Sequence, residues 1–171
     1  MNSRVEWKGY KVLKSDQTTH FGTIRFESGD ITVKEGKLQS GKFVADINTL
    51  ENIDLKDNQE MKSKLEGHLK SADFFEVEKF PTASYEITKV TEAKSGDYNT
   101  ILDGNLTIKG ITKPVQFKAN VTVQNENVSI ATEPTDINRE DYGLNFEIPF
   151  ENGLLNKSIN LQVLIKAMES K

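Results

Sequence analysis

The sequence predicts an all-β fold: a single antiparallel eight-stranded barrel with one short helix covering it. Two observations predict the strands. Apolar and polar residues alternate with period two through most of the chain, as expected for strands that bury one face and expose the other. Short turn signals, such as Glu35-Gly36 and Lys109-Gly110, separate these runs. A third observation predicts the helix, because the apolar residues of one segment are spaced by four.

The clearest strand carries Val115, Phe117 and Val121 on one face, with polar residues between them. Lys109-Gly110 joins it to the preceding run, so the two are predicted to form a hairpin. A turn is also predicted at residues 28–30, Ser-Gly-Asp. About eight strands form a barrel wide enough to hold one small ligand. The predicted strands cover Glu6–Leu13, Phe21–Glu27, Ile31–Val33, Gly41–Asn48, Ala83–Thr91, residues 102–108 and 115–123, Asn127–Thr135 and residues 159–167.

The helix is predicted at about residues 58–70, where Met61, Leu65 and Leu69 form a narrow apolar stripe. Asp57 is predicted as its N-cap, and Glu60 three residues later completes a capping box. The other positions carry mostly Lys and Glu, which suit water. We therefore expect the helix to lie across one side or end of the barrel.

Composition excludes several classes of protein. The net charge is −4 and charges of both signs are interleaved, so no nucleic-acid partner is predicted. There is no cysteine, which removes disulfides and thiolate chemistry. No apolar run is long enough to span a membrane, and the first residues contain no apolar signal core. We expect one domain, residues 1–171, that is either cytoplasmic or a mature form without its leader; monomer and homodimer are equally open.

Residues that could carry catalysis or hold a metal are few. His20 and His68 are far apart in the sequence and lack the spacing of a metal site. Neither a Gly-x-Ser-x-Gly motif nor a glycine-rich phosphate loop occurs. Carboxylate pairs such as Asp54 with Asp57 are interpreted as solvated surface charge. We therefore predict no catalytic residue, no metal and no cofactor other than a bound lipid ligand.

The side chains on the inward parity of the strands would form the wall of a cavity. Small residues such as Ala45, Gly104 and Ala119 are interpreted as leaving room among the large ones. The predicted wall offers no ionisable pair, which favours a binding protein over an enzyme. It consists of Ile24, Phe26, Phe43, Ala45, Tyr85, Ile87, Leu102, Leu106, Val115, Phe117, Val121, Leu161 and Val163.

Two further groups are candidates for ligand contact. Phe74 and Phe75 belong to an aromatic-rich loop, and they either plug one barrel end or line a cavity mouth. Arg139 and Tyr142 flank Asp141, so the arginine either pairs with a carboxylate or contacts a phosphate or quinone head group. The candidate head-group contacts are His20, Asn48, Lys113, Arg139 and Tyr142.

Five segments resemble one known family when read in order. They are His20-Phe-Gly-Thr-Ile-Arg-Phe, Gly41-Lys-Phe-Val-Ala-Asp-Ile-Asn, Leu65-Glu-Gly-His-Leu-Lys-Ser-Ala-Asp-Phe-Phe-Glu-Val-Glu-Lys-Phe-Pro-Thr-Ala, Gly104-Asn-Leu-Thr-Ile-Lys-Gly-Ile-Thr-Lys-Pro-Val-Gln-Phe and Ile137-Asn-Arg-Glu-Asp-Tyr-Gly. The third and fourth are long and specific. Together they resemble the YceI-like family from about residue 5 to residue 168.

This resemblance implies a lipocalin-like barrel with a long hydrophobic cavity. It implies binding of a polyisoprenoid, an isoprenoid quinone or a related amphiphile, for sequestration or transport. Family members are typically bacterial and exported, so the resemblance implies a periplasmic or secreted protein. Two alternatives stay open: an enzyme acting on a small apolar substrate in the same barrel, or a ligand-free interaction module.

Overall fold

The computed structural model describes residues 3–11, 19–71, 75–94, 96–125, 127–144 and 155–168. Within these residues the chain is mostly strand, with one α-helix and one 3-10 helix. The elements are β1 (Arg4–Lys11), β2 (Thr19–Lys34), β3 (Lys37–Asn52), α1 (Gln59–Lys70), β4 (Thr82–Glu92), β5 (Thr100–Ile108), β6 (Ile111–Gln124), β7 (Asn127–Thr132), β8 (Thr135–Asn138), η1 (Arg139–Tyr142) and β9 (Leu155–Met168). The predicted all-β class with one α-helix is confirmed.

The strands form one antiparallel sheet that closes on itself. Their order is β1-β2-β3-β4-β5-β6-β7-β9-β8, and β1 also pairs with β9. Both β7 and β8 pair with β9, one after the other along the same strand. The ring therefore has eight positions, of which the broken strand β7–β8 fills one. This is the predicted eight-stranded barrel, closed by the pairing of β1 with β9.

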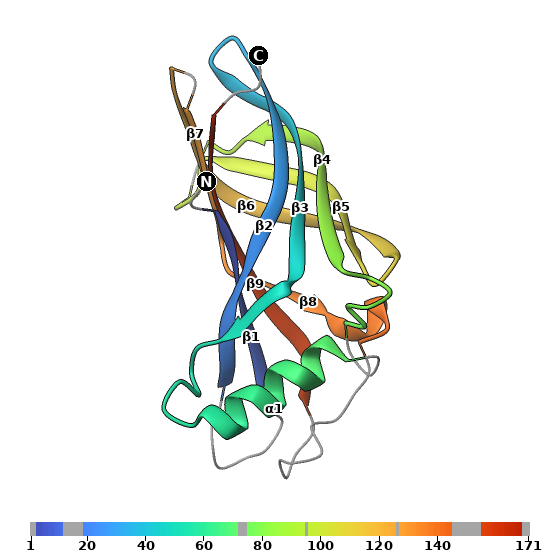
Figure 1. Ribbon diagram of the computed structural model, residues 1–171. Helices are drawn as coiled ribbons and strands as arrows, with labels where there is room; N and C mark the ends of the chain where they lie inside the picture. The colour runs from blue at the N-terminus through green and yellow to red at the C-terminus, as the bar shows by residue number, and fades with distance from the viewer. Residues whose placement is uncertain are drawn as a thin grey trace.

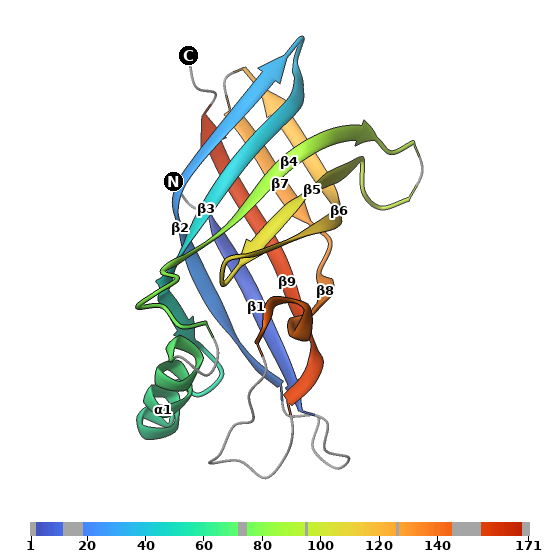
Figure 2. The ribbon, with the colours of Figure 1, turned by 90° about the vertical axis from the view of Figure 1, so that its right-hand side faces the viewer.

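The barrel is elongated, and its two ends differ. The turn between β2 and β3 lies at one end, and α1 lies at the other (Figures 1 and 2). Glu35 and Gly36 make that turn with φ of 55° and 76°, and Lys109 and Gly110 repeat the pattern between β5 and β6 with 53° and 77°. Two successive positive φ angles match the twist of the strands that such turns join.

The turn predicted at Ser28-Gly29-Asp30 is wrong, because β2 continues through it. The register with β3 shifts between Phe26 and Ser28, which marks a β-bulge. One extra residue reverses the parity of the strand, so Ile24 is buried before the bulge and Ile31 is buried after it. A break in period two can thus indicate either a turn or a bulge, and only pairing with β3 distinguishes them.

The predicted strand Asn127–Thr135 is interrupted. It divides into β7 and β8 around Glu133 and Pro134. The N–H of Glu133 donates to the carbonyl of Lys118 at 2.7 Å, which holds this corner against β6. Proline lacks an N–H and fits such a corner better than a continuous ladder.

The helix is confirmed, but its predicted cap is wrong. Asn58, not Asp57, is the N-cap, and its side-chain oxygen accepts the N–H of Met61 at 3.2 Å. Glu60 does not complete a capping box with Asp57 and lies 3.3 Å from Lys64 in an exposed ion pair. Leu65 and Leu69 are the buried residues of the stripe, and α1 packs against β3 at the barrel end.

Candidate functional site

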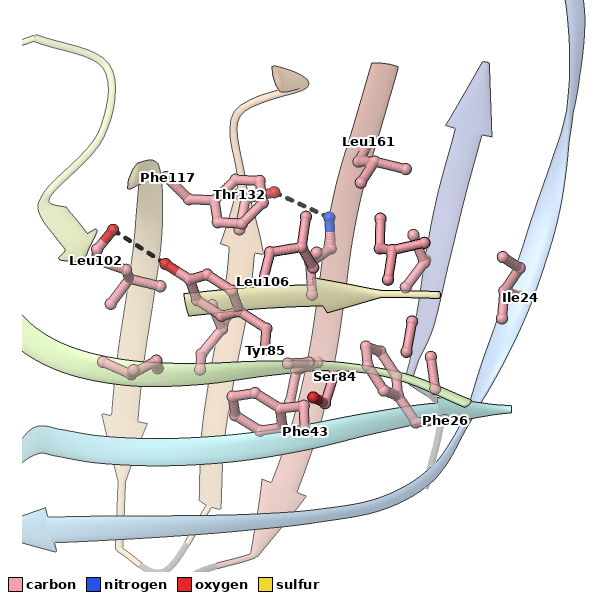
Figure 3. A pocket seen from close by; sticks show the side chains of 18 of the residues that line it. Ile24, Phe26, Phe43, Ser84, Tyr85, Leu102, Leu106, Phe117, Thr132 and Leu161 are labelled. Carbon is pink, nitrogen blue, oxygen red and sulfur yellow. Dashed lines mark hydrogen bonds between the residues drawn. The ribbon is translucent and has the colours of Figure 1, made fainter. Parts of the chain in front are cut away.

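An apolar cavity lies inside the barrel (Figure 3). Its volume is about 80 Å³. Strands from all around the ring contribute to its wall, so it is enclosed by the closed sheet and not by a single hairpin. The lining residues are Val5, Ile24, Phe26, Phe43, Ala45, Ile47, Phe75, Ala83, Ser84, Tyr85, Ile87, Leu102, Leu106, Ile108, Phe117, Ile130, Thr132, Leu161, Val163 and Ile165.

The cavity wall is almost entirely hydrocarbon. The Tyr85 hydroxyl donates to the carbonyl of Val115 at 2.7 Å and lies 3.3 Å from that of Leu102. The hydroxyl oxygen of Thr132 accepts the N–H of Val163 at 2.9 Å. Figure 3 shows the Tyr85 and Thr132 oxygens directed at backbone atoms. Burial, reinforced by the negative charge of Asp103, raises the pKa of Tyr85, so this phenol stays neutral.

Two aromatic rings pack against each other in the wall. Tyr85 and Phe117 meet edge to face with ring centroids 5.1 Å apart, and Phe117 is 1% exposed. A Cβ on Gly104 would lie 2.6 Å from Cζ of Tyr85 and 2.4 Å from the carbonyl oxygen of Glu86. The interpretation that Gly104 leaves cavity space is therefore wrong: the tyrosine ring occupies that space. Ala119 is fully buried but does not line the cavity, whereas Ala45 does.

The cavity is small for a ligand site. Pockets that hold drug-sized ligands span about 300–1,000 Å³. A volume of about 80 Å³ exceeds what one water needs but is far below that range. A long chain would therefore occupy this space only by moving wall side chains or by extending along the barrel axis.

Most of the predicted wall residues come together around this cavity. Val115 does not line it and packs partly buried against the core. Val121 lies instead at a second hollow with Leu38 and Val90, near the β2–β3 turn, because β6 runs past the cavity toward that end. Of the aromatic loop, Phe75 lines the cavity and Phe74 falls outside the described residues.

Several lining residues were missed by the sequence reasoning. Ile130 and Ile165 lie in strands that the sequence did predict, Val5 directly precedes the predicted strand Glu6–Leu13, and Ile47 and Ile108 extend predicted inward faces. Ile165 continues the alternation of Leu161 and Val163, and Ile47 continues that of Phe43 and Ala45. Period two was therefore a sufficient signal for these residues.

His20 lies at the α1 end of the barrel and is 4% exposed. Its Nδ1 is 2.8 Å from Oδ2 of Asp54. The other carboxylate oxygen of Asp54 accepts the N–H of Phe21 at 2.8 Å and the side-chain amide of Asn52 at 2.5 Å. The interpretation of Asp54 as solvated surface charge is therefore wrong, because it organises this end of the barrel.

This polar network also holds the helix. Asn52 is fully buried, and its backbone N–H donates to Oε2 of Glu66 on α1 at 2.7 Å. Lys62 donates to the same oxygen at 2.8 Å. Burial alone would raise the pKa of Glu66, but the hydrogen bonds from Lys62 and the Asn52 N–H outweigh it and hold the pKa below its usual value. The helix is thus fastened through an ionised carboxylate.

Two of the candidate head-group residues lie on the exterior. Asn48 is exposed at a point where the β2–β3 register shifts, and its backbone N–H donates to Asp46 at 3.0 Å. Lys113 is exposed on β6 opposite Leu106. Neither lines the cavity: Asn48 lies within an irregular stretch of β3, and Lys113 lies close to the turn that closes the β5–β6 hairpin.

The remaining two candidates belong to η1 and are buried. The guanidinium of Arg139 donates to the carbonyl of Leu144, and burial lowers its pKa, opposed by the charge of Glu140. Tyr142 is 2% exposed, and its hydroxyl has no hydrogen-bond partner among the described residues. Burial, together with Asp141, raises the pKa of Tyr142 to about 12. The structure places both beside β6 and β9 but not in the cavity wall.

Within the described ranges, no group of three or more His, Asp or Glu side chains is placed to hold a metal ion. In the same ranges, no helix is long and apolar enough to cross a membrane.

The fold and site define a class of protein: a closed, eight-stranded antiparallel barrel around an apolar cavity, with a helix across one end. The chain belongs to the YceI-like domain family, whose model matches residues 1–167. A UPF0312 protein of Pseudomonas putida is 26% identical over 176 residues, covering 98% of this chain and 81% of that protein. Protein YceI of Salmonella arizonae is 35% identical over 126 residues, covering 74% of this chain and 58% of that protein.

Solved structures share the fold. The crystal structure of BcnA from Burkholderia cenocepacia matches with a TM-score of 0.72 and 16% identity, covering 97% of this chain and 96% of that one. The YCEI protein of Campylobacter jejuni matches with a TM-score of 0.64 and 17% identity, covering 95% and 92%. At these identities the likeness concerns the fold alone.

Proposed function

We propose that this protein binds a long apolar ligand, such as a polyisoprenoid, an isoprenoid quinone or a related amphiphile, inside the barrel. The physiological role would be sequestration or transport. The observation that carries the proposal is the cavity inside the barrel, whose wall is mostly hydrocarbon and whose Tyr85 and Thr132 hydroxyls form hydrogen bonds with backbone atoms. No catalytic role is needed, because the wall presents no ionisable pair.

The energetics favour a chain over a compact molecule. Each buried CH₂ contributes roughly 0.8 kcal/mol, so one isoprene unit contributes roughly 3 kcal/mol before the cost of association. The present cavity accommodates only a short segment of such a chain. Further units would bind by displacing rotatable side chains along the barrel axis, a cost that a longer ligand offsets with more buried surface.

Mass spectrometry of an organic-solvent extract tests the proposal directly. The purified protein is extracted, and the stripped protein is reloaded with a defined polyisoprenol. We expect an apolar ligand in the extract and stoichiometric reloading. An empty extract combined with failure to reload would reject the proposal.

A matched pair of variants locates the binding. Ala45→Leu adds bulk to the cavity wall, whereas Ala131→Leu adds the same side chain on the opposite parity of β7. We expect reloading to fall at least about fivefold in the first variant and to be unchanged in the second, since the first fills the space that the ligand needs. Equal reloading by both would place the ligand elsewhere.

One observation favours a second candidate function. The cavity volume of about 80 Å³ is far below that of ordinary ligand pockets, which suits a ligand-free interaction module. Failure of both extraction and reloading would support this alternative.

Location is part of the proposal. The family resemblance supports export to the periplasm or beyond, as monomer or homodimer. Fractionation of cells that express the full-length gene product tests it: recovery in the cytoplasmic fraction alone would contradict export.

A further inference from the structure

The indole of Trp7 is buried, and its N–H has no hydrogen-bond partner among the residues that the structure describes. The residue is 7% exposed. A buried N–H that has lost its bond to water is rare in native proteins and calls for an explanation. The neighbouring residues give one.

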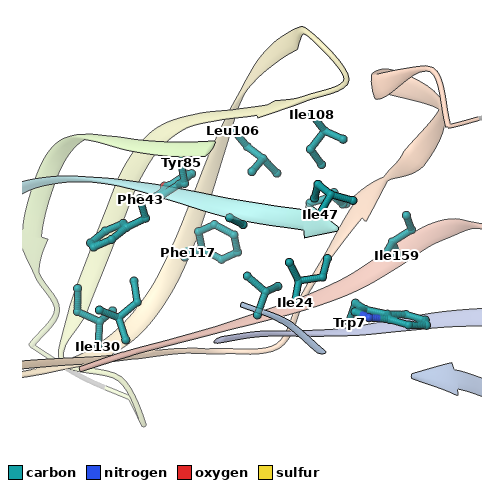
Figure 4. Close-up of a cluster of buried hydrophobic side chains, with 14 of the residues drawn as sticks. Trp7, Ile24, Phe43, Ile47, Tyr85, Leu106, Ile108, Phe117, Ile130 and Ile159 are labelled. Atoms are coloured by element: carbon teal, nitrogen blue, oxygen red, sulfur yellow. The ribbon is translucent and has the colours of Figure 1, made fainter. Parts of the chain in front are cut away.

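The register of β1 places Trp7 next to the cavity. Its partner in β9 is Leu161, and Val5 precedes it by two residues on the same face. Both Leu161 and Val5 line the cavity, so Trp7 forms the next inward layer toward the end that α1 covers. Figure 4 shows Trp7 near Ile24 and Ile159, at the edge of the buried cluster.

A glycine makes room for this indole. Gly22 is the partner of Trp7 in β2, and a Cβ there would lie 2.8 Å from Cζ2 of Trp7 and 1.8 Å from the carbonyl oxygen of Glu51. The backbone therefore accommodates a large aromatic ring whose polar atom gains no bond within the described chain. Phenylalanine would place an apolar aromatic ring there without an N–H that needs a partner.

We infer that the Trp7 indole N–H is the hydrogen-bond donor for the polar end of the ligand. This rests on the proposed function and narrows the ligand class to long apolar molecules with a terminal oxygen acceptor, such as a carbonyl, ester or alcohol. The hydrocarbon part of the ligand lies in the cavity, and its terminal oxygen reaches the level of Trp7, toward α1. A pure hydrocarbon offers this N–H no acceptor, so it binds more weakly than an oxygen-bearing ligand of the same chain length.

The test compares two probes, hexadecyl acetate, whose ester oxygens accept hydrogen bonds, and nonadecane, a hydrocarbon of matching chain length. Affinities are measured by displacement of N-phenyl-1-naphthylamine from the wild type, Trp7→Phe and Tyr142→Phe. The last variant is the matched control, because it removes another buried hydroxyl that lacks a hydrogen-bond partner among the described residues and lies outside the cavity wall. We expect the ester-to-alkane affinity ratio to fall about 3- to 10-fold in Trp7→Phe and to stay unchanged in Tyr142→Phe.

Fluorescence provides a second measurement that needs no variant. The chain has one tryptophan, so its emission reports Trp7 alone. We expect hexadecyl acetate to shift this emission to longer wavelength and nonadecane to leave it in place. An unchanged affinity ratio in Trp7→Phe, or a loss confined to Tyr142→Phe, overturns the inference while both probes still bind. Failure of both probes to bind any variant rejects the proposed function itself.

Discussion

The middle of the barrel and its α1 end are stabilised in opposite ways. In the middle, Tyr85 and Phe117 pack edge to face, and the hydroxyls of Tyr85 and Thr132 form hydrogen bonds with backbone atoms. At the α1 end, Asn52, Asp54 and Glu66 link three elements through hydrogen bonds to carboxylate oxygens. The first region depends on shape and burial, and the second on polar partners that must all be satisfied.

This difference suits the two regions to different roles: accommodating an apolar ligand and attaching the helix. An apolar middle can receive an apolar chain without leaving any polar group unpaired. The polar end fastens the helix by directional hydrogen bonds to Glu66. The four predictions below test whether the two regions respond independently, from the largest expected effect to the smallest.

Phe117→Ala is expected to lower the free energy of unfolding by about 4 kcal/mol, because a fully buried ring leaves a cavity beside Tyr85. Urea unfolding followed by circular dichroism measures it. The loss should be the same at pH 4 and pH 7, since no titratable group is involved directly. A loss below about 1 kcal/mol would mean that the middle collapses to fill the space.

Asn52→Leu is expected to cost about 3 kcal/mol in the same measurement. The substitution keeps the size but leaves Asp54 without an amide donor and the N–H of Leu55 without its acceptor. Hydrogen exchange should show faster exchange in α1 and little change in β5 and β6. Equal loosening of both regions would show that they are not independent.

Glu66→Gln is expected to lower the free energy of unfolding by about 1 kcal/mol at pH 7. It should also make this free energy depend less on pH. The folded-state pKa of Glu66 is depressed, so its contribution is fully present above the usual carboxyl value of about 4.3 and is lost as pH falls through the lower folded value. Unfolding free energies measured between pH 2.5 and 6 for both proteins test the sign. A variant that loses the same stability at pH 2.5 as at pH 6 would contradict the role of this carboxylate.

Asn58→Ala is expected to lower the free energy of unfolding by about 1 kcal/mol, since the Met61 N–H loses its side-chain acceptor. Asp57→Ala serves as the matched control, because the capping geometry belongs to Asn58 alone. Thermal unfolding of the two variants distinguishes them. A larger effect of Asp57→Ala would restore the cap predicted from the sequence.

Local pattern was enough to predict much of the site. Phe43 and Ala45 alternate with polar residues and do line the cavity, and the same alternation extended by one step would have found Ile47. The irregular positions were not predictable in this way. The bulge after Phe26 and the register shift near Asn48 depend on how β3 pairs with β2, which period two does not encode.

Polar residues were the weakest part of the prediction. Asp54 looks like any surface carboxylate in the sequence, yet folding brings it to His20 across 34 positions of the chain. Asn52 and Glu66 carry no motif and acquire their roles only because α1 crosses the end of β3. The sequence suggested no role for Trp7, since a buried N–H without a partner among the described residues is visible only when its neighbours are in place.

By itself the sequence determined the alternation that makes strands, the turns that carry positive φ, the helix, and hence the closed barrel with an apolar inside. These are local properties, set by residues within a few positions of one another. Tertiary structure alone decided the size of the cavity, the filling of the space at Gly104 by Tyr85, and the network that anchors α1. Each of these depends on atoms that are far apart in the chain and meet only when the ring closes.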